Sequence, residues 1–309
     1  MRGKETGRLN CAYCLSILAL IYAAVVWGST FFLVKRTLQS VDPVTLIAYR
    51  FAIASLVTAG IVKLRGKALF KDFKAGLVLG VLLWLIFLTQ TSGLVIITAS
   101  NSGFITGLYV PLVPVFGLLW FRRGPRVEET LAVTLAVAGL WVLTGGIQSA
   151  NRGDLLTLGT AMVVALHILF SEKYVRGDRD PFVLSFQQFF VVFVLSAAQV
   201  ILFGLPLEAS GPTTGWTIVY LALFATISTF AAQTIAQKHV DAVPVALIFT
   251  LEPVFAALFA WTLGGELFRT HGAVGGSMIL VAMLVPQWRR LLGWVRRYPA
   301  EPAAPRTFT

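Results

Sequence analysis

The chain has 309 residues, of which 57% are apolar and only 13% are charged, and its mean hydropathy is +0.81. Soluble domains usually carry about 25% charged residues, so this composition excludes an ordinary water-soluble enzyme and indicates a multi-pass membrane protein. The net charge of +11 does not call for a nucleic-acid partner, because most basic residues fall in the joints between apolar stretches.

Ten apolar stretches follow one another along the chain, each close to the roughly 20 residues that an α-helix needs to cross a bilayer. They lie at 13–34, 43–62, 73–93, 99–121, 128–147, 154–172, 181–203, 214–236, 241–263 and 271–288. The stretches are continuously apolar, whereas the strands of a membrane barrel would alternate, so we predict helices. The first stretch could also be a cleavable signal peptide, but the absence of a small-residue cleavage site before Lys35-Arg36 favours a retained helix.

The basic residues are distributed unevenly between the two sets of alternate joints. If the N-terminus is cytoplasmic, 20 of the 25 Lys and Arg residues fall on the cytoplasmic side, four fall outside, and Arg50 lies within a span. Positively charged loops stay in the cytoplasm, so we expect a protein of the cell (inner) membrane with both termini cytoplasmic.

The second half of the sequence repeats the first. The Pro111 segment of the fourth stretch parallels the Pro253 segment of the ninth, and Asp42-Pro43 parallels Asp180-Pro181. We therefore predict repeats at residues 1–148 and 149–290, followed by a cytoplasmic tail at 291–309. Five spans per repeat is an odd number, so the second copy must enter the membrane from the opposite side. Inverted repeats of this kind are typical of transporters, which bind substrate between the repeats near the midplane.

Helix-breaking residues fall at matching places in the two repeats, in stretches four and nine. The fourth stretch contains Gly107, Pro111 and Pro114, and the ninth contains Pro244 and Pro253. Such paired interruptions indicate a transport path, although they could also serve only to shape helix packing.

Several segments resemble one known family. They are Trp27 to Phe31 continuing to Lys35, Pro43 to Arg50-Phe51, Thr98 to Phe104, Ala246 to Ala257, and Gly265-Glu266. In order and spacing these segments are similar to the drug/metabolite transporter superfamily, specifically its EamA-type exporters. The resemblance implies an all-α integral membrane fold of ten transmembrane helices, arranged as two inverted five-helix repeats around a central cavity, and the export of small metabolites such as amino acids. The first repeat lacks the family's Gly-Glu after the fourth helix, and Gln188 stands where the repeat offset would place a second Arg50.

Arg50 and Glu252 are the two clearly intramembrane charges of the sequence. Each costs at least a few kcal/mol if it faces lipid (about 2.5–3.5 kcal/mol for Arg), so each should face water or a partner. Helix rise places both at nearly the same depth, so a direct or water-bridged pair is one possibility. Arg50 could alternatively hold a substrate carboxylate, and Glu252 a substrate amine or a proton.

Neutral polar and aromatic side chains complete the candidate substrate site. The polar candidates are Gln90, Asn101, His167, Gln187, Gln188 and Gln233, and the aromatic candidates are Trp27, Tyr49, Trp84 and Tyr109. The polar groups could bind an amino-acid backbone or simply hydrogen-bond between helices. The aromatic rings could line a cavity for a flat or amphipathic substrate, or pack against neighbouring helices.

These features favour a secondary transporter that exports small amphipathic metabolites, such as amino acids, including aromatic ones, or drug-like compounds. It would work by alternating access in the bilayer, and Glu252 or His167 would carry any coupled proton. A transporter of phosphorylated or nucleotide-linked sugars is an alternative, but it would call for several basic residues in the cavity. A membrane-embedded transferase is a weaker alternative, because no nucleophile with its base is spaced for catalysis. No cofactor and no metal site is expected, since the three His are scattered.

Overall fold

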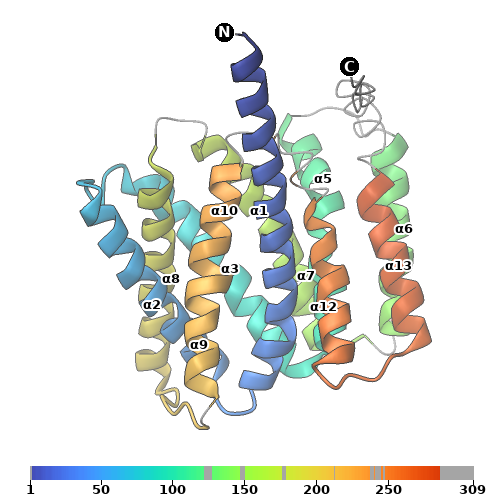
Figure 1. Cartoon of the computed structure of the whole chain (residues 1–309). Helices are drawn as coiled ribbons and strands as arrows, with labels where there is room; N and C mark the ends of the chain where they lie inside the picture. The colour runs from blue at the N-terminus through green and yellow to red at the C-terminus, as the bar shows by residue number, and fades with distance from the viewer. Residues whose placement is uncertain are drawn as a thin grey trace, which may run out of the picture.

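The computed structural model describes residues 2–121, 127–146, 150–175, 179–211, 213–236 and 248–285, together with Val240 and Val245. All regular structure in these ranges is helical, and the helices form a bundle (Figure 1). The elements are α1 (Arg2–Thr37), α2 (Pro43–Leu64), α3 (Phe73–Ile96), α4 (Ala99–Gly107), α5 (Tyr109–Phe121), α6 (Val127–Thr144), α7 (Arg152–Val175), α8 (Pro181–Phe203), α9 (Thr214–Ala222), the π-helical turn η1 (Leu223–Ser228), α10 (Thr229–Ala236), α12 (Leu251–Thr262) and α13 (Thr270–Leu284).

The helices account for all ten predicted spans. Six segments are long and apolar enough to cross a bilayer: Tyr13–Thr37, Pro43–Leu64, Phe73–Ile96, Arg152–Ser171, Pro181–Phe203 and Thr214–Ala236. Shorter apolar helices, Thr130–Thr144, Leu251–Thr262 and Thr270–Leu284, occupy the fifth, ninth and tenth spans. Helices α4 and α5 together form the fourth, so the prediction of a ten-span helical membrane fold is confirmed.

Two spans are interrupted within the bilayer. The fourth breaks at Leu108, between α4 and α5. Pro111 causes the break, since it has no N–H to pair with the carbonyl four residues earlier, at Gly107. The eighth span contains the π turn η1 between α9 and α10, which the sequence did not indicate. The expected interruption at Pro244 lies outside the described residues.

The second helix of each repeat begins with the same cap. Asp42 Oδ1 accepts hydrogen bonds from the backbone N–H groups of Val44 (2.8 Å) and Thr45 (3.2 Å). Asp180 Oδ1 accepts in the same way from Phe182 (2.9 Å) and Val183 (3.4 Å). A proline follows each aspartate at the first helical position, where its missing N–H costs nothing.

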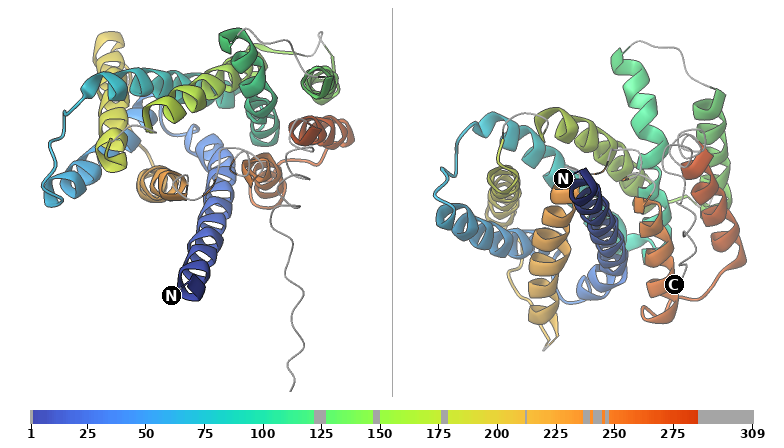
Figure 2. Two further views of the ribbon diagram at one scale, coloured as in Figure 1. Left: turned by 90° about the horizontal axis from the view of Figure 1, so that it is seen from above. Right: turned by 45° about the horizontal axis from the view of Figure 1, so that its top comes forward.

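The packing of the helices has the symmetry of an inverted repeat. Helix α2 packs against its counterpart α8, α4 against α12, and α6 against α13. Helix α1 contacts α10 and α12, just as its counterpart α7 contacts α3, α4 and α5. In Figure 1, α1 begins at the upper end of the bundle and α7 begins at the lower end, and Figure 2 shows that helices of both halves surround the middle of the bundle. The two five-helix units therefore run in opposite directions. The predicted repeat boundary at 148 and the tail at 291–309 lie outside the described residues.

Candidate functional site

Arg50 is the most completely enclosed charge among the candidate residues. It lies on α2, and only 5% of it is exposed. Its Nε donates a hydrogen bond to Thr226 Oγ1 (2.7 Å), and its Nη2 donates to the carbonyl of Ala225 (3.0 Å). Its guanidinium also lies 4.5 Å from the centre of the Phe87 ring. The charge is thus stabilised by a carbonyl, a hydroxyl and an aromatic face.

The partners of Arg50 belong to the π turn η1. Thr226 Oγ1, which accepts a hydrogen bond from Arg50, itself donates one to the carbonyl of Leu221, at 2.8 Å. The Ala225 carbonyl accepts a second hydrogen bond, from Trp27 Nε1, at 3.1 Å. Turns of this type occur mostly as single bulges in α-helices, frequently at functional sites. Here the turn brings together α1, α2 and the eighth span. We call this meeting of Arg50, Trp27, Ala225 and Thr226 the junction.

Trp27 belongs to a continuous series of aromatic rings. It packs edge-on against Phe230 of α10 (5.8 Å between ring centres) and Phe249 (5.1 Å). The series continues from Phe230 to Phe189 at 5.4 Å, on to Phe51 at 5.7 Å, and ends at Phe87 at 4.8 Å. Because Phe87 is also the ring beneath Arg50, the aromatic series extends from the Arg50 guanidinium to the start of the ninth span.

Glu252 lies on the other side of α1. It is in the first turn of α12, and its backbone carbonyl lies only 3.0 Å from where a Cβ of Gly28 would be. Tyr109, at the start of α5, is close enough to Glu252 for an electrostatic interaction. Within the described part of the chain, the Glu252 carboxylate has no hydrogen bond and no ion pair, so it is available to a ligand or a proton.

A direct pair between Arg50 and Glu252 is not formed. Their depths in the membrane permit such a pair, but helix rise gives only the height of a residue and not its direction around the helix axis. Arg50 is turned toward the eighth span, whereas α12 packs against α1 and α4. Trp27-Gly28 of α1 therefore lies between the two charges, with Trp27 touching the partner of Arg50 and Gly28 touching α12.

The polar groups of five other candidates are held by partners other than Arg50, Trp27 and the turn η1, although Trp84 packs in the same cluster as Phe51 and Phe189. The Tyr49 hydroxyl donates to the carbonyl of Leu207 (2.7 Å), and Trp84 Nε1 donates to Gln199 Oε1 (3.2 Å). Gln187 Nε2 donates to the carbonyls of Leu69 (2.9 Å) and Lys71 (2.7 Å). The last two candidates contact each other, since His167 Nε2 lies 2.9 Å from Gln188 Oε1. These contacts join neighbouring helices or loops.

The three remaining polar candidates lie on helices that pack around α1 and α12. Gln90 Nε2 donates to Thr106 Oγ1 (3.3 Å) and so joins α3 to α4. Asn101 is on α4 and Gln233 is on α10. Both are partly buried, and among the described residues the structure gives their side-chain amides no hydrogen bond. Their amides can therefore accept a ligand.

Sequence reasoning missed part of this junction. Ala225 and Thr226 are neither charged nor next to a proline, so the sequence carries no signal for the π turn. Phe51, Phe87 and Phe230 are three of 23 phenylalanines, and apolar composition alone did not distinguish them. In the described ranges, no group of three or more His, Cys, Asp or Glu side chains could hold a metal ion.

Comparisons with known proteins agree with this architecture. Residues 15–145 and 151–285 each match the EamA-like transporter family. The chain is 32% identical over 272 residues to an uncharacterized transporter of Archaeoglobus fulgidus, covering 88% of this chain and 85% of that one. It is 26% identical over 298 residues to the uncharacterized inner membrane transporter YedA of Escherichia coli K12, covering 92% of each chain. The chain is also similar to a solved crystal structure of a protein, with a TM-score of 0.66 and 21% identity, over 89% of this chain and 98% of that one. At this identity the similarity supports the fold alone.

Proposed function

Because the chain belongs to the EamA-like transporter family, we propose that this multi-pass membrane transporter exports small amphipathic metabolites by alternating access. The proposed substrates are amino acids, aromatic ones among them, or drug-like compounds of similar shape. We further propose that it resides in the cell (inner) membrane with both termini in the cytoplasm. The uneven distribution of basic residues supports this orientation.

The environment of Arg50 carries the substrate proposal. This buried guanidinium has no carboxylate within ion-pair distance in the described part of the chain. It also has more N–H donors than its contacts with Ala225 and Thr226 use. A carboxylate of the substrate would supply the missing negative charge and accept the remaining donors.

The surroundings of Arg50 suit the other parts of an aromatic amino acid. Trp27 and the phenylalanine series offer ring faces and edges for an aromatic side chain. Glu252, beyond Gly28, offers a carboxylate to an ammonium group or to a coupled proton. When the repeats rock against each other, α1 would move relative to η1 and α12, and the substrate would be released on the other side.

The alternative substrates are less well supported. Sugar phosphates and nucleotide-linked sugars carry two or more negative charges, and Arg50 is the only basic residue of the described chain placed in the junction. A membrane-embedded transferase would need a nucleophile with a base or a metal. The junction described above offers its polar groups for binding and contains no such pair.

Uptake by proteoliposomes tests the proposal directly. The purified chain would be reconstituted, and the uptake of labelled phenylalanine, lysine and a lipophilic cation measured with and without a pH gradient. We expect saturable flux of at least one of these compounds. If a proton is coupled through Glu252, the pH gradient will accelerate this flux and Glu252→Gln will abolish the acceleration. Absence of saturable flux for all of them would contradict the proposal.

A further inference from the structure

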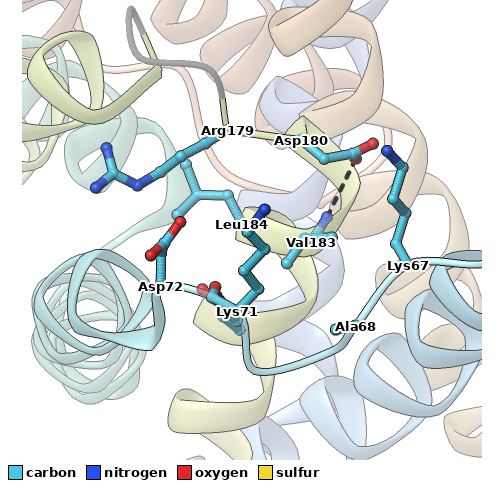
Figure 3. A pocket seen from close by; sticks show the side chains of 9 residues that line it. Lys67, Ala68, Lys71, Asp72, Arg179, Asp180, Val183 and Leu184 are labelled. Atoms are coloured by element: carbon cyan, nitrogen blue, oxygen red, sulfur yellow. Dashed lines mark hydrogen bonds between the residues drawn. The ribbon is translucent and has the colours of Figure 1, made fainter.

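A hollow lined by basic residues lies at the end of the bundle where α2 and α3 are joined, away from the junction around Trp27. Its cavity volume is about 90 Å³. Its walls come from the loop between α2 and α3 and from the start of α8 (Figure 3). The side chains that line it are Lys67, Ala68, Lys71, Asp72, Arg179, Asp180, Val183, Leu184 and Gln187.

The basic groups of this hollow are not neutralised by its acids. Asp180 is already occupied as the cap of α8 and lies 3.6 Å from Arg65 Nη2. In the part of the chain that the structure describes, Lys67, Lys71 and Arg179 form no ion pair. Asp72 is the remaining acid, so the hollow keeps an excess of positive charge. Such a site favours an anion.

Two features show that the hollow is preformed. Gln187 is buried, and its amide donates to the carbonyls of Leu69 and Lys71, which fixes the loop against α8. Arg179 Nε is buried, and among the described residues it has no hydrogen-bond partner. The Nη1 of the same guanidinium donates to the carbonyl of Tyr174, at 3.4 Å. The unpartnered Nε is a donor that an anionic oxygen could satisfy.

An apolar surface adjoins the hollow on the same elements. Phe70, in the same loop, is 52% exposed. Its ring packs edge-on against Phe73, Phe186 and Phe190 at 5.4–5.6 Å between centres. The exposed ring of Phe70, backed by these partly or fully buried rings, together with the basic hollow, has the two-part chemistry of a phospholipid, with its anionic head and apolar chains.

We propose that this hollow binds the phosphate of an anionic phospholipid, such as phosphatidylglycerol, with the acyl chains lying along the Phe70 cluster. The location agrees with the ligand. The hollow is at the end of the bundle where α1 begins, which is the end that carries most of the basic residues. A free phosphate would satisfy the basic groups but would leave the aromatic surface without a role.

Native mass spectrometry of the full chain, released from detergent containing equal amounts of phosphatidylglycerol and phosphatidylcholine, tests this proposal. The wild type should retain phosphatidylglycerol preferentially. The double variant Lys67→Gln/Lys71→Gln should weaken this retention roughly thirtyfold, since each of the two basic residues near a membrane surface contributes about 1 kcal/mol. The matched control is Lys63→Gln/Lys74→Gln, which removes two exposed charges from the same region outside the hollow.

Two further arms identify the source of the phosphate. Inorganic phosphate at millimolar concentration should fail to displace the lipid, and Phe70→Ser should weaken its retention with the basic residues intact. Thermal unfolding in detergent shows whether each variant is folded. Equal loss in the control pair, or displacement of the lipid by inorganic phosphate alone, would overturn the proposal.

Discussion

A charged side chain within a membrane is stable only where protein or water solvates it. Arg50 is solvated by the π turn of the eighth span and by the ring of Phe87. Trp27 shares the Ala225 carbonyl with it. A ligand that binds the Arg50 guanidinium and weakens its bond to the Ala225 carbonyl will therefore also affect the hydrogen bond of Trp27. Because Trp27 lies on α1, the position of α1 will respond.

The hydrogen bond of Trp27 can be tested against that of Trp84. Trp27→Phe keeps an aromatic ring but removes the donor to Ala225, so we expect substrate flux to fall roughly three- to tenfold, the worth of one hydrogen bond. Trp84→Phe keeps a ring in the cluster with Phe51 and Phe189 but removes a donor to Gln199, which is not a partner of Arg50, so it should change flux by less than twofold. Initial rates in proteoliposomes measure both. A similar fall for the two variants would mean that Trp27 acts only through packing.

The individual residues also show how far the sequence could be interpreted. Arg50 and Glu252 stood out because charges in apolar stretches are rare. Their partners could not be derived, because the sequence gives the height of a residue in the membrane but not its direction around the helix. Gln187 illustrates this point, since its amide holds the loop between α2 and α3 rather than facing α1.

At the scale of elements, close approach of helices fixes the junction. A Cβ at Gly28 would lie 2.5 Å from Phe255 Cβ, and one at Gly103 would lie 2.6 Å from Ala256 Cβ. Helix α12 thus contacts α1 and α4 through positions where only glycine fits. The N-terminal ends of α2 and α8 could be predicted from their Asp-Pro caps. The π turn could not be predicted, because it becomes apparent only in the packed structure of the eighth span.

We expect Gly28→Val to separate α1 from α12. Overpacking of this kind costs about 1–3 kcal/mol, so the thermal unfolding midpoint in detergent should fall and substrate flux should be lost. Gly60→Val is the matched control, because Gly60 lies on α2 with nothing within 4 Å of an added Cβ. An unchanged midpoint for Gly28→Val would show that α1 and α12 do not pack as described.

At the scale of the whole molecule, the inverted repeat relates the packing of one half to that of the other. Composition and repeated segments were enough to predict ten spans in two opposed units. The junction itself is asymmetric, because Gln188 replaces a second arginine and contacts His167 instead of a π turn. The first repeat therefore supplies the charged Arg50, and the second repeat supplies the turn η1 that binds its guanidinium.

The two opposed units require both ends of the chain to lie on one side of the membrane. Reporter tags fused at the N-terminus and after residue 309 should both report the cytoplasm, in line with the distribution of basic residues. Activity-based reporters such as alkaline phosphatase and a fluorescent protein distinguish the two sides. Tags on opposite faces would be incompatible with five spans in each unit.

The central claim is that Arg50 binds a substrate carboxylate. Its most direct test compares phenylalanine with phenethylamine, which has the same ring and amine without the carboxylate, in proteoliposomes containing wild type, Arg50→Gln or the exposed-charge control Lys63→Gln. We expect Arg50→Gln to reduce phenylalanine flux at least roughly tenfold more than phenethylamine flux, as loss of a charged hydrogen bond to the carboxylate would. The Lys63→Gln control should match wild type for both compounds. Equal losses for the two compounds would show that Arg50 only supports the helix bundle.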